Sequence, residues 1–462
     1  MLTHKMTENA VIAAIATPVG VGGISVVRIS GGGSLAIADK IFLGKSKLNE
    51  SPSHTAHFGR IVDRSGNFID EVIAIVFRRP NSYTCEDIVE INCHGGYIVT
   101  ERVLQQIFDA GARPAEPGEF TKRAFLNGRI DLSQAEAIGD LIHSESEAAY
   151  RSSVRQLTGE LSLKIRSVRD ELLNLASLLE LELDFSEENV EFANRKSLEK
   201  RLQNAICTVS ELLSSYSIGR LYREGVRVTI VGKPNAGKSS LLNTLLKENR
   251  AIVNDSPGTT RDTISENLSI NGVLFRLTDT AGLRETMDNI EREGVERAKK
   301  EAEESDIVLL VIDYIPFDYN SNDAAYRQLA ESCSKNNIQL IKVWNKIDLY
   351  RGEAPRKHND GFFVSAIRGD GIDLLKNELF KAAVGQHSNE NSIVVTNARH
   401  RDALSRAQAS LSLALDTLKS SRSNEFVALD LRVGLNALGE ITGEITTDDI
   451  LNNIFSKFCI GK

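Results

Sequence analysis

The chain has 462 residues, which is too long for a single hydrophobic core, so two or three domains are expected. Its apolar content of 41% and charged content of 26% are ordinary for a globular protein, and no apolar run is long enough to span a membrane. A net charge of −8 argues against a purely electrostatic nucleic-acid binder, because such proteins are basic.

The cysteines and the N-terminal residues indicate the compartment. Five cysteines are scattered along the chain without a C-x-x-C pair, which fits a reducing environment better than a disulfide framework. The first residues lack the basic region and the cleavage site of a signal peptide. We therefore expect a cytoplasmic protein.

Residues 1–122 have the pattern of a mixed α/β domain. Strands are expected at 11–16, 24–29, 56–62, 72–77 and 88–92, and helices at 34–42 and 98–110. The glycine-rich residues 20–23 are followed by a strand rather than a helix, so they predict a turn and not a nucleotide loop.

The pattern becomes helical at Asp131, where apolar residues recur at helical spacing for more than fifty residues. Further helices are expected at 198–216, 398–419 and 425–440. The segments 123–221 and 386–462 are either two separate helical domains or one domain interrupted by residues 222–385. We expect the insertion, because domain termini often lie close together and exposed loops tolerate insertions.

The most specific motif opens the middle segment. A strand at 228–231 leads into Gly232-Lys-Pro-Asn-Ala-Gly237-Lys238-Ser239, a G-x-x-x-x-G-K-S phosphate loop, and a helix is expected at 240–247. The two glycines let the backbone approach a phosphate closely. Lys238 adds charge near the β- and γ-phosphates, and the Ser239 hydroxyl is a ligand for Mg²⁺.

Two of the motifs that follow are suited to the γ-phosphate and its metal ion. Residues 258–262, Gly-Thr-Thr-Arg-Asp, form a polar loop of the kind that senses a γ-phosphate. A hairpin with strands at 264–270 and 273–278 and an Asn-Gly turn then leads to residues 279–282, Asp-Thr-Ala-Gly. Asp279 can hold Mg²⁺ through water, and Gly282 can bring a backbone N–H to the γ-phosphate.

The last two motifs read the base. After strands at 307–312 and 339–343 comes Asn345-Lys346-Ile347-Asp348, and a strand at 362–364 ends in Ser365-Ala366. Asp348 can accept two hydrogen bonds from the guanine edge, which adenine does not offer. The motifs, in this order and at strand ends, predict a GTPase domain.

Two features depart from a Ras-like site. Leu283 stands where a glutamine usually orients the attacking water, so another group must do so. The acidic candidates, among which composition does not choose, are Glu285, Asp288, Glu291 and Glu293. Asn235 either stabilises the phosphate loop or binds a monovalent cation beside the β/γ bridge.

The chain resembles the MnmE (TrmE) family of bacterial tRNA modification GTPases, within the TrmE-Era-Septin-like GTPases, over essentially all of its length. The resemblance rests on GKPNAGKSSLLN, GTTRD, DTAGLRE, ATPVGVGGISVVRISG, NSYTCEDIVEINCHGG, EFTKRAFLNGRIDLSQAEAI and the terminal FCIGK. It implies a multidomain α/β plus α chain: an N-terminal α+β folate-binding-like domain, a helical bundle domain in two segments, and an inserted Ras-like P-loop GTPase domain.

The resemblance also implies an activity and partners. The family forms a constitutive homodimer and works with the flavoprotein MnmG in a heterotetramer. Together they modify C5 of the wobble uridine of certain tRNAs with a one-carbon unit from a 5-formyl-tetrahydrofolate-type donor. GTP hydrolysis in the family depends on K⁺ and on dimerisation of the G domains.

Residue roles in the GTPase domain follow from the matching motifs. Catalytic roles fall on Lys238, Asn235 and Glu291, the last of which positions the catalytic water. The metal positions are Asn235, Asn254, Ser256 and Thr259 for K⁺, and Ser239 and Thr260 for Mg²⁺. The implied nucleotide-binding residues are Asn235, Ala236, Gly237, Lys238, Ser239, Ser240, Asn254, Asp255, Ser256, Pro257, Gly258, Thr259, Thr260, Asp279, Thr280, Ala281, Gly282, Asn345, Lys346, Asp348, Ser365 and Ala366.

The folate-contacting positions of the family fall on Arg28, Glu86, Arg129 and Lys462. An acidic partner for the pterin edge, with basic groups for the folate's glutamate tail, is chemically sensible, although from sequence alone these residues are ordinary surface charges. Arg129 stands where some members carry lysine, which keeps the charge and changes the geometry. Cys459 matches a functionally sensitive cysteine, and both a packed tail residue and a nucleophile remain open.

A different class of function also fits the GTPase motifs. A pure switch or binding module, such as a ribosome-assembly GTPase, would dock RNA without modifying it. Such proteins usually append a basic RNA-binding domain, which the flanking segments do not resemble. Binding of 5-formyl-tetrahydrofolate discriminates between the two hypotheses.

Overall fold

The structure is a computed structural model that describes residues 10–184, 195–247, 265–279, 301–314, 324–350, 357–358, 361–385, 393–420 and 423–462. The chain divides into two compact units: unit 1 is residues 1–139 and 439–462, and unit 2 is residues 140–438. The boundaries fall inside helices α5 (Leu132–Ile142) and α14 (Asn424–Thr442). The four segments expected from the sequence stay a prediction, because this division does not separate a helical domain from a nucleotide domain.

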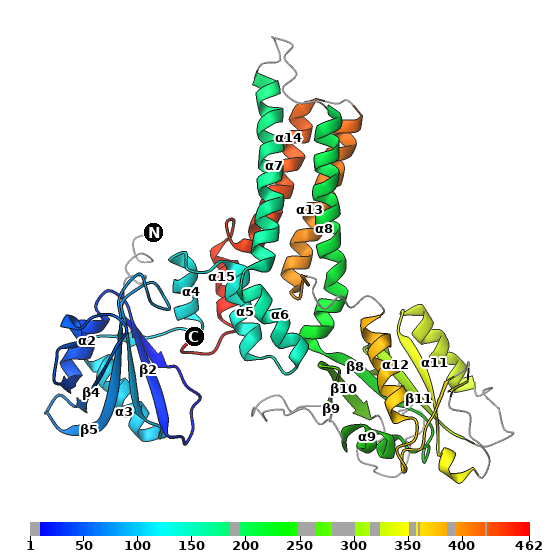
Figure 1. Cartoon of the computed structure of the whole chain (residues 1–462), viewed down its shortest axis with the longest axis horizontal. Coiled ribbons are helices and arrows are strands. Elements are labelled where there is room, and N and C mark those ends of the chain that lie inside the picture. Colours follow the sequence, from blue (N-terminus) through cyan, green and yellow to red (C-terminus); the bar gives the residue numbers. More distant parts are fainter. Residues whose placement is uncertain are drawn as a thin grey trace. The chain divides into compact units, whose positions relative to one another are not determined.

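Unit 1 contains a seven-stranded sheet with helices α2 (Ser34–Ile41) and α3 (Tyr97–Asp109) (Figure 1). Neighbouring strands are antiparallel except for β1 and β7. The strand order is β3 (Phe42–Gly44), β4 (Thr55–Val62), β5 (Phe68–Phe77), β6 (Ile88–His94), β2 (Ile24–Ser30), β1 (Ile12–Ile15) and β7 (Arg113–Pro114). Apolar side chains of the strands and the two helices form one core, as the alternation of the strands predicts. As expected, residues 20–23 form bends that lead into β2 and not into a helix.

Three short helices complete unit 1. They are α4 (Glu119–Leu126), the start of α5 and α15 (Asp448–Phe455). A small apolar cluster joins α5 to α15 through Leu132 and Phe455, which are both buried. The last residue is also anchored, because the backbone N–H of Phe120 donates to the carbonyl of Lys462 at 3.1 Å.

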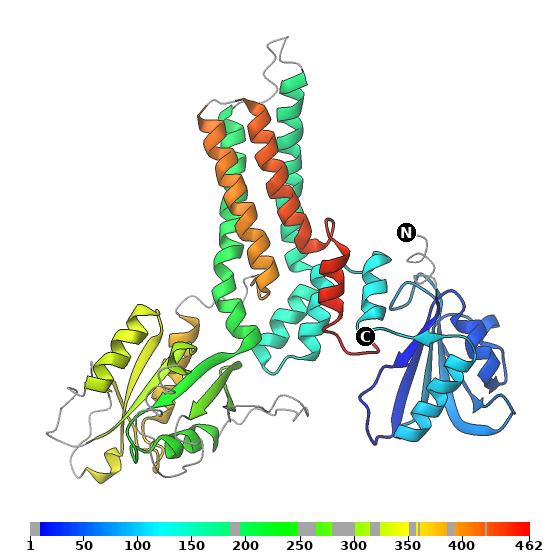
Figure 2. The ribbon, with the colours of Figure 1, turned by 180° about the vertical axis from the view of Figure 1, so that it is seen from behind.

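One group of helices in unit 2 forms a bundle whose long members run side by side in both ribbon views (Figures 1 and 2). They are α6 (Glu147–Leu157), α7 (Glu160–Asp184), α8 (Arg195–Glu224), α13 (Ala398–Lys419) and α14. The helical run expected from residue 131 is not continuous but divides into α5, α6 and α7. The breaks have local causes: the Ser146 side chain caps α6 by accepting from the N–H of Ala149, and Gly159 has a φ of +86°.

The second sheet lies in unit 2 and is mostly parallel. Its order is β13 (Lys357–His358), β14 (Gly361–Phe363), β12 (Gln339–Asn345), β11 (Ile307–Asp313), β8 (Val226–Val231), β10 (Val273–Asp279) and β9 (Ser265–Ile270). Only the outer pairs β9–β10 and β13–β14 are antiparallel. The helices described in this part are α9 (Lys238–Lys247), α11 (Ala324–Lys335) and α12 (Ile372–Val384), and apolar clusters lie on both faces of the sheet. The carboxyl ends of the parallel strands therefore meet at one edge, where ligands bind in such sheets.

The fold class expected from the sequence is confirmed. Helix α8 precedes the parallel sheet and α13 follows it, yet the two helices pack against each other, as an inserted domain requires. Helix α8 is longer than the expected 198–216 because its last turns continue toward the sheet, where Leu221 is buried in the sheet's core. Among the described residues, no helix is both long and apolar enough to cross a bilayer.

Gly219 offers a direct test of the packing within unit 2. A Cβ at this position of α8 would lie 2.1 Å from the carbonyl oxygen of Val395. We expect Gly219→Ala to lower the free energy of unfolding by about 1–3 kcal/mol, the cost of overpacking. A helix without this contact would instead gain up to about 1 kcal/mol from the same change.

Chemical denaturation of the full chain measures the effect. Ser217→Ala, at an exposed position two residues earlier on α8, is the matched control and should be close to neutral. Stabilisation by Gly219→Ala would contradict the packing described here.

Candidate functional site

In the loop between β8 and α9, the backbone at two glycines lies so close to neighbouring atoms that no side chain would fit. A Cβ at Gly232 would lie 2.3 Å from the carbonyl oxygen of Val311, and a Cβ at Gly237 would lie 2.2 Å from Nδ2 of Asn345. Gly237 has a φ of +89° and Asn235 a φ of +64°, both in the left-handed region. The loop is therefore wrapped tightly in front of the N-terminus of α9, where an anion is stabilised by the helix dipole and free N–H groups.

Lys238 places a buried cation at this loop. Its side chain is 7% exposed, and its Nζ donates to the carbonyl oxygens of Gly232 and Lys233 at 2.9 and 3.0 Å. Burial lowers the pKa of Lys238, and the negative charge of Asp279 opposes that shift. Its hydrogen-bond partners among the described residues are neutral carbonyls, so the amino group is not tied to a carboxylate and is available to an anionic ligand.

Ser239 and Asp279 form an oxygen pair beside the lysine. The Ser239 hydroxyl, at the start of α9, donates to Oδ2 of Asp279, at the end of β10, over 2.8 Å. Hydroxyl and carboxylate oxygens are the ligands that Mg²⁺ prefers, and they fit an ion that is shared with phosphate oxygens. The third predicted Mg²⁺ ligand, Thr260, lies outside the described residues.

Asn345 connects the phosphate loop to a second loop. This residue is 1% exposed, its Nδ2 donates to the carbonyl of Ala236 at 2.9 Å, and its Oδ1 accepts from the N–H of Ala366 at 3.0 Å. Both polar groups of one buried side chain are thus used to hold two loops together. The second loop is fixed further by Thr244 of α9, whose hydroxyl donates to the Ala366 carbonyl at 2.6 Å.

Asp348 lies next to the second loop and is oriented by it. Its Oδ1 accepts from the Ser365 hydroxyl at 2.6 Å, which leaves acceptor capacity on the carboxylate. Lys346, between Asn345 and Asp348, has a φ of +68° and pairs with Asp313 at 2.7 Å. The structure therefore brings together the residues predicted for the phosphate loop, for Asp279 and for both base-side motifs.

Other predicted site residues lie outside the described part of the chain. These are Asn254, Asp255, Ser256, Pro257, Gly258, Thr259, Thr260, Thr280, Ala281, Gly282 and Glu291, with the alternatives Glu285, Asp288 and Glu293. Their roles stay predictions. Of the predicted K⁺ ligands only Asn235 is described, and its side chain is exposed.

The four predicted folate residues gather in unit 1. Arg28 of β2 lies over the rings of Tyr83 and Phe120 at 5.1 and 5.6 Å, and Arg129 lies over the Tyr83 ring at 4.9 Å. Arg28 is also paired with Glu90 at 2.8 Å, so its charge is already matched. The N–H of Phe120 donates to the backbone carbonyl of Lys462, which brings the C-terminal residue to the same place.

Glu86 belongs to a hydrogen-bonded network that sequence reasoning missed. It accepts from Arg123 and from the Ser30 hydroxyl, and Arg123 in turn pairs with Glu119. A signal for Arg123 was present, because Glu119 and Arg123 stand at i and i+4 in the EFTKRAFLNGR motif, the spacing of an ion pair on a helix. Cys459 is an exposed free cysteine, and its backbone carbonyl accepts from the N–H groups of Gly118 and Lys462.

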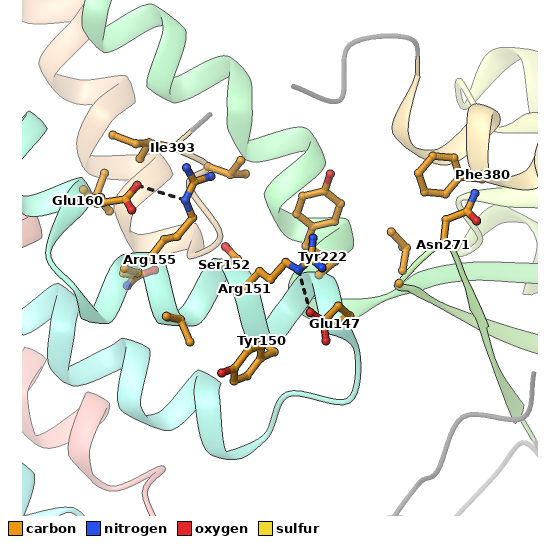
Figure 3. A pocket seen from close by; sticks show the side chains of 17 residues that line it. Glu147, Tyr150, Arg151, Ser152, Arg155, Glu160, Tyr222, Asn271, Phe380 and Ile393 are labelled. Carbon is orange, nitrogen blue, oxygen red and sulfur yellow. Dashed lines mark hydrogen bonds and ion pairs between the residues drawn. The ribbon is translucent and has the colours of Figure 1, made fainter. Parts of the chain in front are cut away.

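Unit 2 also contains a cavity of about 640 Å³ that is separate from the phosphate loop (Figure 3). It lies between α6 and the turn of the β9–β10 hairpin, Asn271-Gly272, where the carbonyl of Gly272 accepts from the N–H of Ala148 at 2.9 Å. The charged side chains that line it are paired, Arg151 with Glu147 and Arg155 with Glu160. None of the described residues predicted to bind the nucleotide lines this cavity.

Three features of this sheet together define a P-loop GTPase domain. They are a phosphate loop between a parallel strand and a helix, an Asp at the end of the neighbouring strand, and an Asn and an Asp on the base side. Comparison with known proteins agrees. The family described as "MnmE helical domain" matches residues 132–459, and that described as "GTP-binding protein TrmE N-terminus" matches residues 11–129. The chain belongs to the MnmE family of tRNA modification GTPases.

Individual relatives cover the whole chain. The tRNA modification GTPase MnmE of Chlorobaculum tepidum is 47% identical, with 99% of each chain covered. The protein of the same name from Salinibacter ruber is 45% identical over 99% of this chain and 100% of its own. Among solved structures, a variant of Aquifex aeolicus Era bound to GDP.AlF4- matches 41% of this chain and 67% of its own at 28% identity, and its TM-score of 0.25 is too low to compare the folds.

The bridge made by Asn345 generates a prediction. Asn345→Ala removes two hydrogen bonds and leaves the Ala236 carbonyl and the Ala366 N–H without their partner. We expect a loss of about 1–3 kcal/mol in unfolding free energy and at least a roughly tenfold weaker affinity for GDP and GTP alike, because both ends of the site lose their support.

Fluorescent nucleotide titration and chemical denaturation measure the two effects. Gln339→Ala, at the exposed start of the same strand β12, is the control and should change neither. If Asn345→Ala bound nucleotide as tightly as the unchanged protein, the bridge would not be what aligns the two loops.

Proposed function

We propose that this protein hydrolyses GTP and that hydrolysis serves tRNA modification. The observation that carries the GTPase part is the buried amide of Asn345, which joins the phosphate loop at Ala236 to the base-side loop at Ala366. One side chain thus fixes the separation of the phosphate end and the base end of one nucleotide. The tRNA part rests on membership of a family whose relatives are named tRNA modification GTPases.

The phosphate end is held by groups of the loop and of α9. The N–H groups of the loop donate to phosphate oxygens, and Lys238 lies where it neutralises the β- and γ-phosphates. Ser239 and Asp279 would hold Mg²⁺, which when bound neutralises charge on the phosphate oxygens. These contacts position the γ-phosphate for attack by water and stabilise the charge that develops in the transition state.

The base end is read by Asp348. With Ser365 donating to one of its oxygens, the carboxylate is held in one orientation and can accept from N1–H and N2–H₂ of guanine. Adenine has no such donor pair, so an adenine nucleotide would leave the carboxylate unpaired. The backbone N–H of Ala366 is fixed beside it by Asn345.

The finer features of hydrolysis are also part of the proposal. Leu283 cannot orient water, so we assign that role to Glu291, and we assign to Asn235 the binding of a K⁺ ion together with Asn254, Ser256 and Thr259. The exposure of Asn235 supports this, because an exposed residue is accessible to an ion from solvent. A second G domain from the partner of a homodimer would complete the site.

The modification chemistry forms the last part of the proposal. The gathering of Arg28, Glu86, Arg129 and Lys462 around Tyr83 and Phe120 supports a site for 5-formyl-tetrahydrofolate or a related one-carbon donor. With the flavoprotein MnmG, the protein would transfer that unit to C5 of the wobble uridine of certain tRNAs in the cytoplasm.

Asp348→Asn tests the base-reading part of the function. The amide loses one acceptor and gains a donor, so it should bind guanine at least about tenfold more weakly and accept xanthine, which carries an oxygen at C2. We expect steady-state hydrolysis of GTP to fall and hydrolysis of xanthosine triphosphate to rise. Unchanged selectivity between the two nucleotides would falsify the assignment of Asp348, and the gain of the second activity shows that the variant is folded.

The cation requirement gives a separate test. Turnover of GTP should be several-fold faster in KCl than in NaCl at equal ionic strength, and Asn235→Gly should remove most of the difference. Glycine is the suitable replacement because it adopts the φ of +64° without strain. Asn235→Asp, which keeps a side-chain oxygen, serves as the control and should retain the K⁺ preference, whereas equal rates in both salts for the unchanged protein would refute the cation role.

A further inference from the structure

Arg123, a buried arginine of α4, holds the side chain of Glu86, one of the residues of the proposed folate site. The Arg123 side chain is 6% exposed, and its Nη1 donates to both carboxylate oxygens of Glu86, at 3.2 and 3.0 Å. Its Nη2 donates to Glu119 and to the carbonyl of Ala10, each at 2.9 Å. The planar guanidinium therefore fixes the carboxylate in both position and orientation.

The loop that carries Glu86 also helps to fix the position of this residue. Cys85, just before it, has a φ of +60°, an unusual backbone conformation for a residue with a side chain. Buried Thr84 holds the loop against this strain, because its hydroxyl is bonded to that of Ser30 at 2.7 Å and its carbonyl accepts from Asn127. The Ser30 hydroxyl also donates to Oε2 of Glu86 at 2.7 Å.

The hydrogen bonds are shared unequally between the two oxygens of Glu86. Oε2 accepts from Arg123 and from Ser30, whereas Oε1 accepts only the longer bond from Arg123 among the described residues. A carboxylate oxygen can accept about two hydrogen bonds, so Oε1 keeps acceptor capacity for a ligand. The side chain is 21% exposed, so part of it is accessible to a ligand.

We infer that Arg123 is the positioning residue for Glu86 and thereby sets the specificity of the site for ligands that present an N–H donor edge. The inference rests on the proposed folate function, since the aminopyrimidinone edge of a pterin carries such donors. Because the Arg123 side chain is only 6% exposed, we assign it an action through Glu86 and not a contact with the ligand. It acts by preventing Glu86 from rotating or turning away when the ligand binds.

The chain offers a matched control on the other side of Glu119. Arg113 pairs with this carboxylate at 2.6 Å, just as Arg123 does at 2.9 Å. Arg123→Lys and Arg113→Lys therefore both disturb Glu119 while keeping its charge partner. Only Arg123→Lys removes the planar group that spans Glu86 and Glu119.

The experiment compares two ligands in the full-length protein by isothermal titration calorimetry: 5-formyl-tetrahydrofolate and its 2-desamino-2-methyl analogue, which lacks the 2-amino donor. We expect the unchanged protein and Arg113→Lys to prefer the first ligand by about ten- to a hundredfold, the effect of one hydrogen bond to a charged acceptor. Arg123→Lys should reduce this preference to about threefold or less. This coupling between ligand and variant separates positioning from a general loss of fold.

The possible results distinguish a positioning role of Arg123 from a purely structural one. Loss of affinity for both ligands by the same factor in Arg123→Lys would mean that the arginine is only structural. Failure of the unchanged protein to bind either ligand would overturn the folate proposal, and the inference with it. If Arg123→Lys does not fold, as thermal unfolding would reveal, Ser30→Ala replaces it, and an undiminished preference in that milder variant would count against the inference.

Discussion

The amide of Asn345 joins two loops of unit 2 that come from opposite ends of the GTPase segment. Its two polar atoms are out of reach of water, because the side chain is 1% exposed, so each would go unsatisfied if the loops moved apart. The same side chain lies where a Cβ on Gly237 would be, which ties the glycine of the phosphate loop to the base-side motif. The distance between the two halves of the site is thus set by these two hydrogen bonds and by this close contact.

Unit 1 uses charge in a comparable way. Arg113, Glu119, Arg123 and Glu86 alternate in sign along a chain of ion pairs. Burying such groups is costly unless each is paired. Burial alone would raise the pKa of Glu119, but its hydrogen bonds to Arg113 and Arg123 have the larger combined effect, so the pKa of Glu119 is lowered. Most of the network is hidden, and Glu86 retains some exposure for a ligand.

Much of the fold was predictable because its signals are local. A strand precedes the phosphate loop, the Asn-Gly turn and the base-side motif. The ends of these strands lie within one or two residues of the ends predicted from the apolar pattern. The breaks at Ser146 and Gly159 were missed, since a helical period continues across them and only capping ends the helices. Arg123 was missed for another reason: a buried charge looks like a surface charge in sequence until its partners, which are Glu86, Glu119 and the carbonyl of Ala10, are known.

Strand β10 connects two sets of contacts whose partners are distant in the sequence. At its carboxyl end Asp279 accepts from Ser239, and at its start the carbonyl of Gly272 receives an N–H of the first turn of α6. Between them Arg276 pairs with Glu145, just ahead of that helix. Because β10 is hydrogen-bonded to β8 on one side and to β9 on the other, it holds the oxygen pair of Ser239 and Asp279 at a fixed separation from the N-terminus of α6.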